Sequence, residues 1–149
     1  MQIVDFQWNR PQNEIIESVT GGDKGLLFLA NEAKRLMDPY VPADSLVLAQ
    51  NVNVYVDNDK QGIVHYLSPY AHYQYIGELY VDPGTGAGGF YIEGVGWRSR
   101  SGVAKKPSGK KLKHGTFRHP LATSKWDKAM MAARKGDLTK AYQNYIGSK

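Results

Sequence analysis

Hydrophobic side chains repeat at helical spacing in two parts of the chain. Between Asp23 and Pro39 they fall three or four positions apart and form one stripe with charged residues beside it, which predicts an amphipathic helix. Asp23 is a suitable N-cap, and Pro39 should end the helix because the residue before a proline avoids helical angles. The stripe consists of Leu26, Leu29, Ala30, Ala33, Leu36 and Met37.

A second helical pattern begins after Ser124 and runs through the last residues of the sequence. Gly136, followed by Asp137, is expected to kink or split this helix. Residues 13–19 are predicted to form one or two helical turns ahead of a pair of glycines. The spacing of the second pattern is set by Trp126, Met130, Ala133, Leu138, Tyr142 and Tyr145.

Alternating and β-branched runs predict strands. Residues 46–56 become strictly alternating in their second half, and residues 62–67 form another β-rich run. The segment DNDKQ between them is typical of a turn, so we expect a hairpin. Residues 2–8 also alternate and are predicted to form a first strand.

The segment SPYAHYQYIGELYVDP, residues 68–83, holds four of the ten tyrosines. A short helix over about residues 69–76, ended by Gly77, would place these rings on different sides. Residues 77–118 are rich in glycine and show little periodicity, which predicts a long loop. Within it, residues 82–118 are expected to form an extended arm or loop.

Length and composition fit one globular domain over residues 1–149, with 42% hydrophobic and 22% charged residues. The absence of cysteine excludes disulfides, cysteine-ligated zinc and thiol catalysis. No apolar run reaches the roughly 20 residues of a membrane span. The first residues lack the basic start and apolar block of a signal peptide, so we expect a soluble protein made inside a cell, without a membrane partner.

Motifs for catalysis or metal binding are missing from the sequence. No His-x₃-His or HExxH pair and no GxSxG occurs. The glycines of GTGAGG, residues 84–89, lack the preceding strand, following helix and lysine of a phosphate-binding loop. We therefore predict no enzymatic activity, no metal and no cofactor. The histidines without such a motif are His65, His72, His114 and His119.

Charge is distributed unevenly along the chain. Residues 1–97 carry twelve acidic and five basic side chains, whereas residues 98–118 carry eight basic and no acidic ones. Such a basic segment could contact DNA phosphates, or it could pair with the acidic surface of a neighbouring subunit. Composition does not decide between these two interpretations. The eight candidates are Arg98, Arg100, Lys105, Lys106, Lys110, Lys111, Lys113 and Arg118.

The clustered tyrosines could belong to a core, a ligand pocket or an interface. Tyr66 and Tyr70 suit a core, while no polar groups converge beside the rings as a ligand pocket would need. A rigid aromatic ring buries much area with little loss of entropy, so it is favoured at the centre of protein contacts. We predict a core role for some rings and an interface for the rest. The interface candidates are Tyr70, Tyr73, Tyr75, Tyr80 and Trp97.

Three segments, in this order, resemble a known family. They are DPYVPADSLVL (38–48), IVHYLSPYAHYQYIGELYV (63–81) and HPLATSKWDKAMMAARKGDL (119–138). Together they are similar to the minor capsid proteins of tailed bacteriophages and prophages of Gram-positive hosts, which belong with the small tail-completion and head–tail connector proteins of the neck. The resemblance covers about residues 22–146 and is most specific in the PYAHYQYxG and WDKAMM blocks. It is weakest over residues 82–118.

One departure from the family pattern concerns a turn. The family usually has YVP followed by a D-T-G-x-L turn, whereas this chain reads YVPADSL over residues 40–46. The glycine that would make the turn tight is therefore missing, which predicts a differently built turn after the long helix.

The resemblance implies an α+β subunit in which a long helix and a C-terminal helix pack on a small, mainly antiparallel β-sheet, with a long Gly/Lys-rich loop. It also implies a structural, non-enzymatic role in a ring of six or twelve copies, in the virion neck between head and tail, assembled in the bacterial host cytoplasm. The implied partners are further copies of the chain, other neck, portal-adaptor and tail proteins, and DNA in the channel. A DNA-binding accessory protein that uses residues 98–118 is the alternative.

Overall fold

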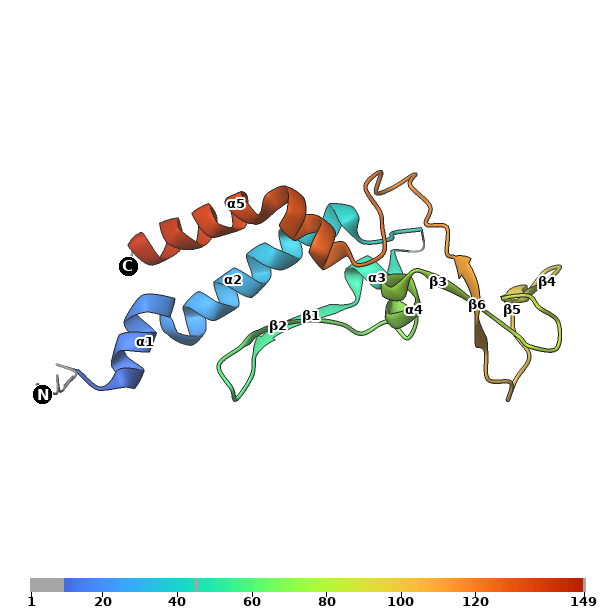
Figure 1. Cartoon of the computed structure of the whole chain (residues 1–149), viewed down its shortest axis with the longest axis horizontal. Coiled ribbons are helices and arrows are strands. Elements are labelled where there is room, and N and C mark those ends of the chain that lie inside the picture. Colours follow the sequence, from blue (N-terminus) through green and yellow to red (C-terminus); the bar gives the residue numbers. More distant parts are fainter. Residues whose placement is uncertain (1–9, 45, 149) are drawn as a thin grey trace, which may run out of the picture. The chain divides into compact units, whose positions relative to one another are not determined.

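The structure, a computed structural model, describes residues 10–44 and 46–148, so the strand predicted over residues 2–8 lies outside the described residues. The chain is α+β, as predicted, with small two-stranded antiparallel sheets (Figure 1). It divides into two compact units. The first contains residues 1–36, 53–65 and 132–149, and the second contains residues 37–52 and 66–131.

The first unit combines helices with a β-hairpin. Its elements are α1 (Gln12–Thr20), most of α2 (Gly22–Met37), most of β1 (Val52–Val56) and of β2 (Gly62–Tyr66), and the C-terminal part of α5 (Trp126–Gly147).

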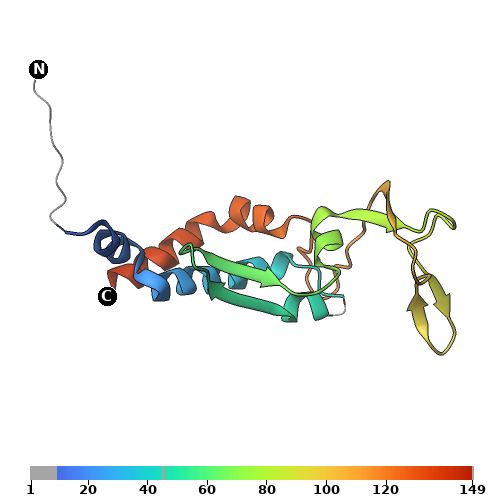
Figure 2. The same ribbon diagram turned by 90° about the horizontal axis from the view of Figure 1, so that it is seen from below.

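Helix α2 packs against both α5 and the hairpin β1–β2, as Figures 1 and 2 show. The ring of Phe28 on α2 stacks on Tyr145 of α5, with 4.1 Å between the ring centroids. Gly62 of β2 lies so close to α2 that a Cβ there would stand 2.9 Å from the Leu26 carbonyl oxygen. Ala30 and Leu36, two members of the hydrophobic stripe from which the helix was predicted, are buried.

The second unit contains short helices and two strand pairs. Strand β3 pairs antiparallel with β6, and β4 pairs antiparallel with β5. The elements are a 3₁₀ helix (Asp38–Tyr40), α3 (Val47–Gln50), α4 (Ala71–Ile76), β3 (Glu78–Val81), β4 (Phe90–Ile92), β5 (Gly96–Arg98), β6 (Lys106–Lys111) and the start of α5.

Trp126 forms the centre of the core of this unit. Its side chain is only 3% exposed, and the rings of Tyr66 and Tyr75 meet it edge to face, each with 5.2 Å between centroids. Burial, with the nearby Asp38 carboxylate, raises the pKa of Tyr66 to about 12. The hydrophobic residues buried with Trp126 in this unit are Met37, Val41, Ala43, Leu48, Ala49 and Met130.

The helix boundaries agree with the sequence in part. Helix α2 ends at Met37, just before Pro39, as predicted. Its start differs from the prediction, because α2 begins at Gly22 and Asp23 lies inside the first turn. Instead of capping the helix, the Asp23 carboxylate forms an ion pair with Lys60 at 3.0 Å. A split of the last helix at Gly136, one of the two outcomes predicted there, is wrong, since α5 continues through that residue.

Two predictions of extended or irregular backbone are also wrong. The first part of the strand predicted over residues 46–56 is the helix α3, whose N-cap Leu46 has a left-handed φ of 61°. That conformation costs a residue other than glycine about 1 kcal/mol. In the turn after the long helix, where the family pattern has a glycine, Leu46 therefore takes a left-handed conformation. Residues 77–118, predicted as a loop, contain the four strands β3 to β6.

Candidate interaction surface

The loop that follows β3 is closed by a buried carboxylate. Asp82 is 6% exposed and accepts the Gly84 backbone N–H at 2.7 Å. Its two oxygens also bind the Arg100 guanidinium, with Nε–Oδ2 at 2.5 Å and Nη2–Oδ1 at 2.6 Å. These hydrogen bonds, those from Arg100 above all, lower the pKa of Asp82 to about 2. Arg100 is therefore paired within the chain.

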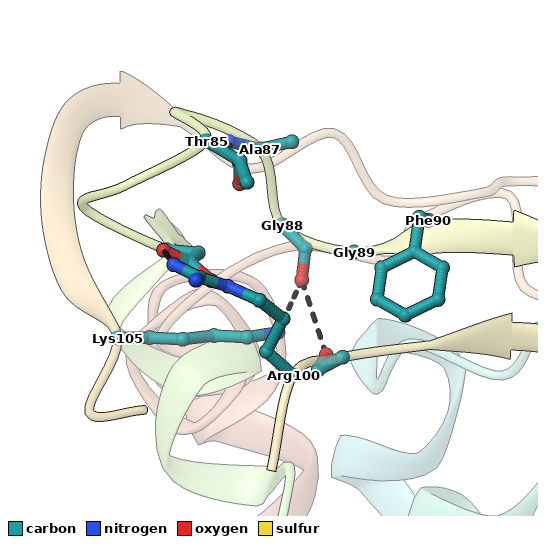
Figure 3. A pocket seen from close by; sticks show the side chains of 9 residues that line it. Thr85, Ala87, Gly88, Gly89, Phe90, Arg100 and Lys105 are labelled. Carbon is teal, nitrogen blue, oxygen red and sulfur yellow. Dashed lines mark hydrogen bonds and ion pairs between the residues drawn. The ribbon is translucent and has the colours of Figure 1, made fainter. Parts of the chain in front are cut away.

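A cavity of about 80 Å³ lies beside this ion pair (Figure 3). The Gly88 carbonyl oxygen there accepts hydrogen bonds from the Lys105 ammonium and from the Ser99 hydroxyl, the latter at 3.4 Å. Phe90 lines the same cavity. A space of this size holds a few water molecules rather than an organic ligand. We therefore interpret the cavity as a space left among the hydrogen-bonded groups of this loop, and not as a ligand site.

Acid is expected to weaken the Asp82–Arg100 closure. A carboxyl whose folded pKa, about 2, lies below its ordinary value of 3.8 stabilises the fold above about pH 4 and loses that contribution as the pH falls toward 2. The Asp82→Asn variant should therefore be less stable than the wild type at pH 7, and this difference should shrink between pH 4 and pH 2. Thermal unfolding of the wild type and of Asp82→Asn, at several pH values between 7 and 2, measures this difference in stability.

The matched control is Asp59→Asn, which removes an exposed carboxylate that makes no ion pair in the described part of the chain. Its stability difference from the wild type should stay small at every pH. An Asp82→Asn difference that is the same at pH 2 and pH 7 would contradict the prediction.

The hairpin β4–β5 exposes nearly all of its apolar side chains. Tyr91 and Trp97 face each other across the two strands, with 5.9 Å between ring centroids, and Trp97 is 71% exposed. Two strands of three residues each are marginally stable in water without further packing. Figure 2 shows this hairpin, in yellow, projecting from the other strands of the second unit. The large hydrophobic residues exposed on the hairpin are Phe90, Tyr91, Ile92, Val95 and Trp97.

Sequence reasoning identified only Trp97 in this group. The available signal was the pair of short runs FYI and GWR, separated by Glu93–Val95 with a glycine between them. Gly94 takes a φ of 78° in that turn, a conformation that glycine adopts without strain. Exposed apolar patches of this kind are typical of interaction surfaces.

Seven of the eight predicted basic residues are exposed, and six of these seven make no ion pair within the described residues. Arg100 is paired with Asp82, and Lys105 is half-buried and bonded to Gly88. The others make no ion pair within the described residues and are free to attract an anionic partner. They are Arg98 on β5, Lys106, Lys110 and Lys111 on β6, and Lys113 and Arg118 after it.

The tyrosines divide between surface and core. Tyr70 is 67% exposed, so the interpretation that assigns it to the core is wrong. Tyr73 is partly exposed and packs edge to face on Tyr80, with 4.7 Å between centroids. Tyr75 is half-buried against Trp126, and burial together with Asp127 raises the pKa of its hydroxyl. Tyr70 and Tyr73 are therefore the more accessible tyrosines of the predicted interface, beside Trp97.

Two histidines form hydrogen bonds with segments that are distant in the sequence. His119 Nδ1 lies 2.7 Å from the Val41 carbonyl oxygen, and His114 Nδ1 lies 2.9 Å from the Gln74 side-chain oxygen. Burial lowers the pKa of His114. In the part of the chain that the structure describes, no three His, Asp or Glu side chains gather as a metal site would require.

The surface thus joins an apolar hairpin to a row of exposed cations, an arrangement suited to binding a macromolecule. Among the described helices, none has an apolar stretch long enough to cross a membrane. No family model, no curated protein and no solved structure matches this chain.

Proposed function

We propose that the chain is a structural subunit of a tailed-phage virion that forms a ring in the neck, where head and tail are joined. The family resemblance of its sequence blocks suggests this role, and the exposed hairpin β4–β5 is the observation that carries it. A lone copy leaves five large apolar side chains uncovered there, which favours a protein that works in an assembly. The proposal includes no enzymatic step.

The two most specific blocks of the resemblance also pack on each other. Tyr75, from PYAHYQYxG, meets the ring of Trp126, from WDKAMM, and its carbonyl oxygen accepts the Lys125 N–H at 2.9 Å. Gly77, the glycine of the first block, lies so close to Ser124, just ahead of the second block, that an added Cβ would stand 2.6 Å from the Ser124 Cβ. The shared sequence pattern thus corresponds to one packed cluster, which supports a common fold for the subunit.

The test is loss of the gene from the phage or prophage that encodes the chain. Electron microscopy of the lysate is expected to find DNA-filled heads and separate tails, with joined particles recovered when the intact gene is supplied in trans. Joined, infectious particles made without the gene would refute the proposal.

A second candidate function is that of a DNA-binding accessory protein. It is favoured by the six exposed cations from Arg98 to Arg118 that make no ion pair within the described residues. Binding that rests on phosphate contacts weakens steeply as salt increases. Tight binding of a DNA duplex by the purified chain at about 50 mM salt, lost at about 200 mM salt, together with normal joining of heads and tails in the gene deletion, would select this function instead.

A further inference from the structure

A groove of about 390 Å³ lies at the junction of α1 and α2 in the first unit. Ile16 and Leu26 supply apolar walls, and Glu17 and Asp23 supply carboxylates. Ile16 is 60% exposed, and Val19, one turn further along α1, is 65% exposed. The groove is large enough to take an aromatic side chain, and its apolar wall continues onto the open surface of the helix.

The charges at this groove are opposite to those of the basic segment, residues 98–118, that begins at the last residue of β5. Residues 11–23 include three acidic side chains and no basic one. Glu14 and Glu17 make no ion pair within the described residues, whereas Lys60, which also lines the groove, is already paired with Asp23. The groove is therefore acidic and apolar.

The hairpin is also apolar, and it carries one acidic side chain, Glu93, and one basic side chain, Arg98, so the excess positive charge of this region comes from the strand β6. Arg98 directly follows Trp97 and is exposed, and the strand β6 adds further exposed lysines. The large apolar side chains of the hairpin and of the α1 surface are exposed. Complementary charge around apolar contact residues gives an interface its register and its specificity.

We propose that the hairpin β4–β5 of one copy binds the acidic, apolar groove between α1 and α2 of a second copy of this chain. The contact rests on the proposed function and specifies the surfaces that neighbouring subunits use. It joins two different surfaces, so each bound copy still has one free hairpin or one free groove. Repetition of such a heterologous contact closes a ring when the rotation between copies permits it.

Cysteine cross-linking tests the contact directly, because the chain contains no cysteine of its own. One protein carries Val95→Cys at the hairpin turn, which keeps a small apolar side chain there. A second carries Asn13→Cys, at a residue that lines the groove. A short bismaleimide added to the mixture should link the two proteins into a heterodimer.

The matched control replaces Asn13→Cys by Gln143→Cys, an exposed position on α5 outside the groove. Mixed with Val95→Cys, it should give little linked product. Equal linking by both partners, or linking of Val95→Cys mainly to itself, would overturn the proposed contact.

Side-chain variants provide a second measurement, by analytical ultracentrifugation of the wild type and each variant. Trp97→Ala should weaken self-association about thirtyfold, as the loss of a central aromatic anchor does. Arg98→Glu and Glu17→Lys should each weaken it, and a mixture of these two proteins should associate more strongly than either alone. A different result would assign the hairpin to nucleic acid instead. In that case Trp97→Ala would self-associate as the wild type does, and the wild type would bind a single-stranded oligonucleotide tightly while Trp97→Ala would not.

Failure of this contact is distinguishable from failure of the proposed function. If the gene deletion leaves heads and tails unjoined but Val95→Cys and Asn13→Cys do not link, the chain acts in the neck through other surfaces. If the two proteins link but the deletion has no effect on particles, the contact exists and the neck role is wrong.

Discussion

Replacing Trp126 with alanine is expected to lower the free energy of unfolding by about 3–5 kcal/mol, the range for large aromatic side chains removed from a core. Trp126 is 3% exposed and meets Tyr66 and Tyr75 edge to face. Its loss would leave a cavity lined by both rings and by Met130, which is 2% exposed. Urea denaturation followed by far-ultraviolet circular dichroism measures the change.

Trp97→Ala is the matched control for this substitution, since it removes the same side chain from a position that is 71% exposed. Its effect on the free energy of unfolding should stay within about 0.5 kcal/mol. Equal effects of the two substitutions would contradict the view that the core of the second unit is built around Trp126.

The long helices were predictable because their hydrophobic residues repeat locally. The stripe between Asp23 and Pro39 is visible in the sequence, and three of its members, Ala30, Leu36 and Met37, are among the buried residues. Local chemistry also identified the end of α4, where Gly77 adopts a φ of 74°. Such signals depend only on neighbours a few positions away.

The short elements were not predictable in the same way. The run LVLA at residues 46–49 suits a strand or a buried helical turn equally well, and periodicity alone cannot separate them. Burial of the adjacent residues Leu48 and Ala49 agrees with the helix α3. Strand β6, with the sequence KPSGKK, contains residue types depleted in strands. It forms by pairing with β3, a distant segment that local pattern does not reveal.

The positive charge of the candidate surface was predictable from the sequence, but its ion pair and its apolar hairpin were not. The run of basic residues identified the exposed cations on β6, because lysines seldom lie buried. Nothing local indicates that Arg100 is bound by Asp82, eighteen positions earlier. The apolar hairpin was likewise obscured by the glycines around it, which are typical of a loop.

Gly25 is expected to tolerate alanine poorly although it lies inside a helix. Alanine normally stabilises a helix by about 1 kcal/mol relative to glycine. At Gly25, however, the added Cβ would stand 2.1 Å from the backbone oxygen of Thr20. That oxygen also accepts the Tyr142 hydroxyl at 2.6 Å, so the clash would displace α1 and disturb its bond to α5.

Gly25→Ala should therefore lower the free energy of unfolding by about 2 kcal/mol, within the range for overpacked sites. Gly136→Ala is the matched control, because a Cβ added to Gly136 in α5 would meet no other atom within 4 Å. This second substitution should raise stability by about 0.5–1 kcal/mol. Chemical denaturation of the two variants gives both values. If the two substitutions stabilise the protein equally, α1 does not fold back on α2 through the tight glycine turn, and the groove assigned to the neighbouring hairpin is not formed as described.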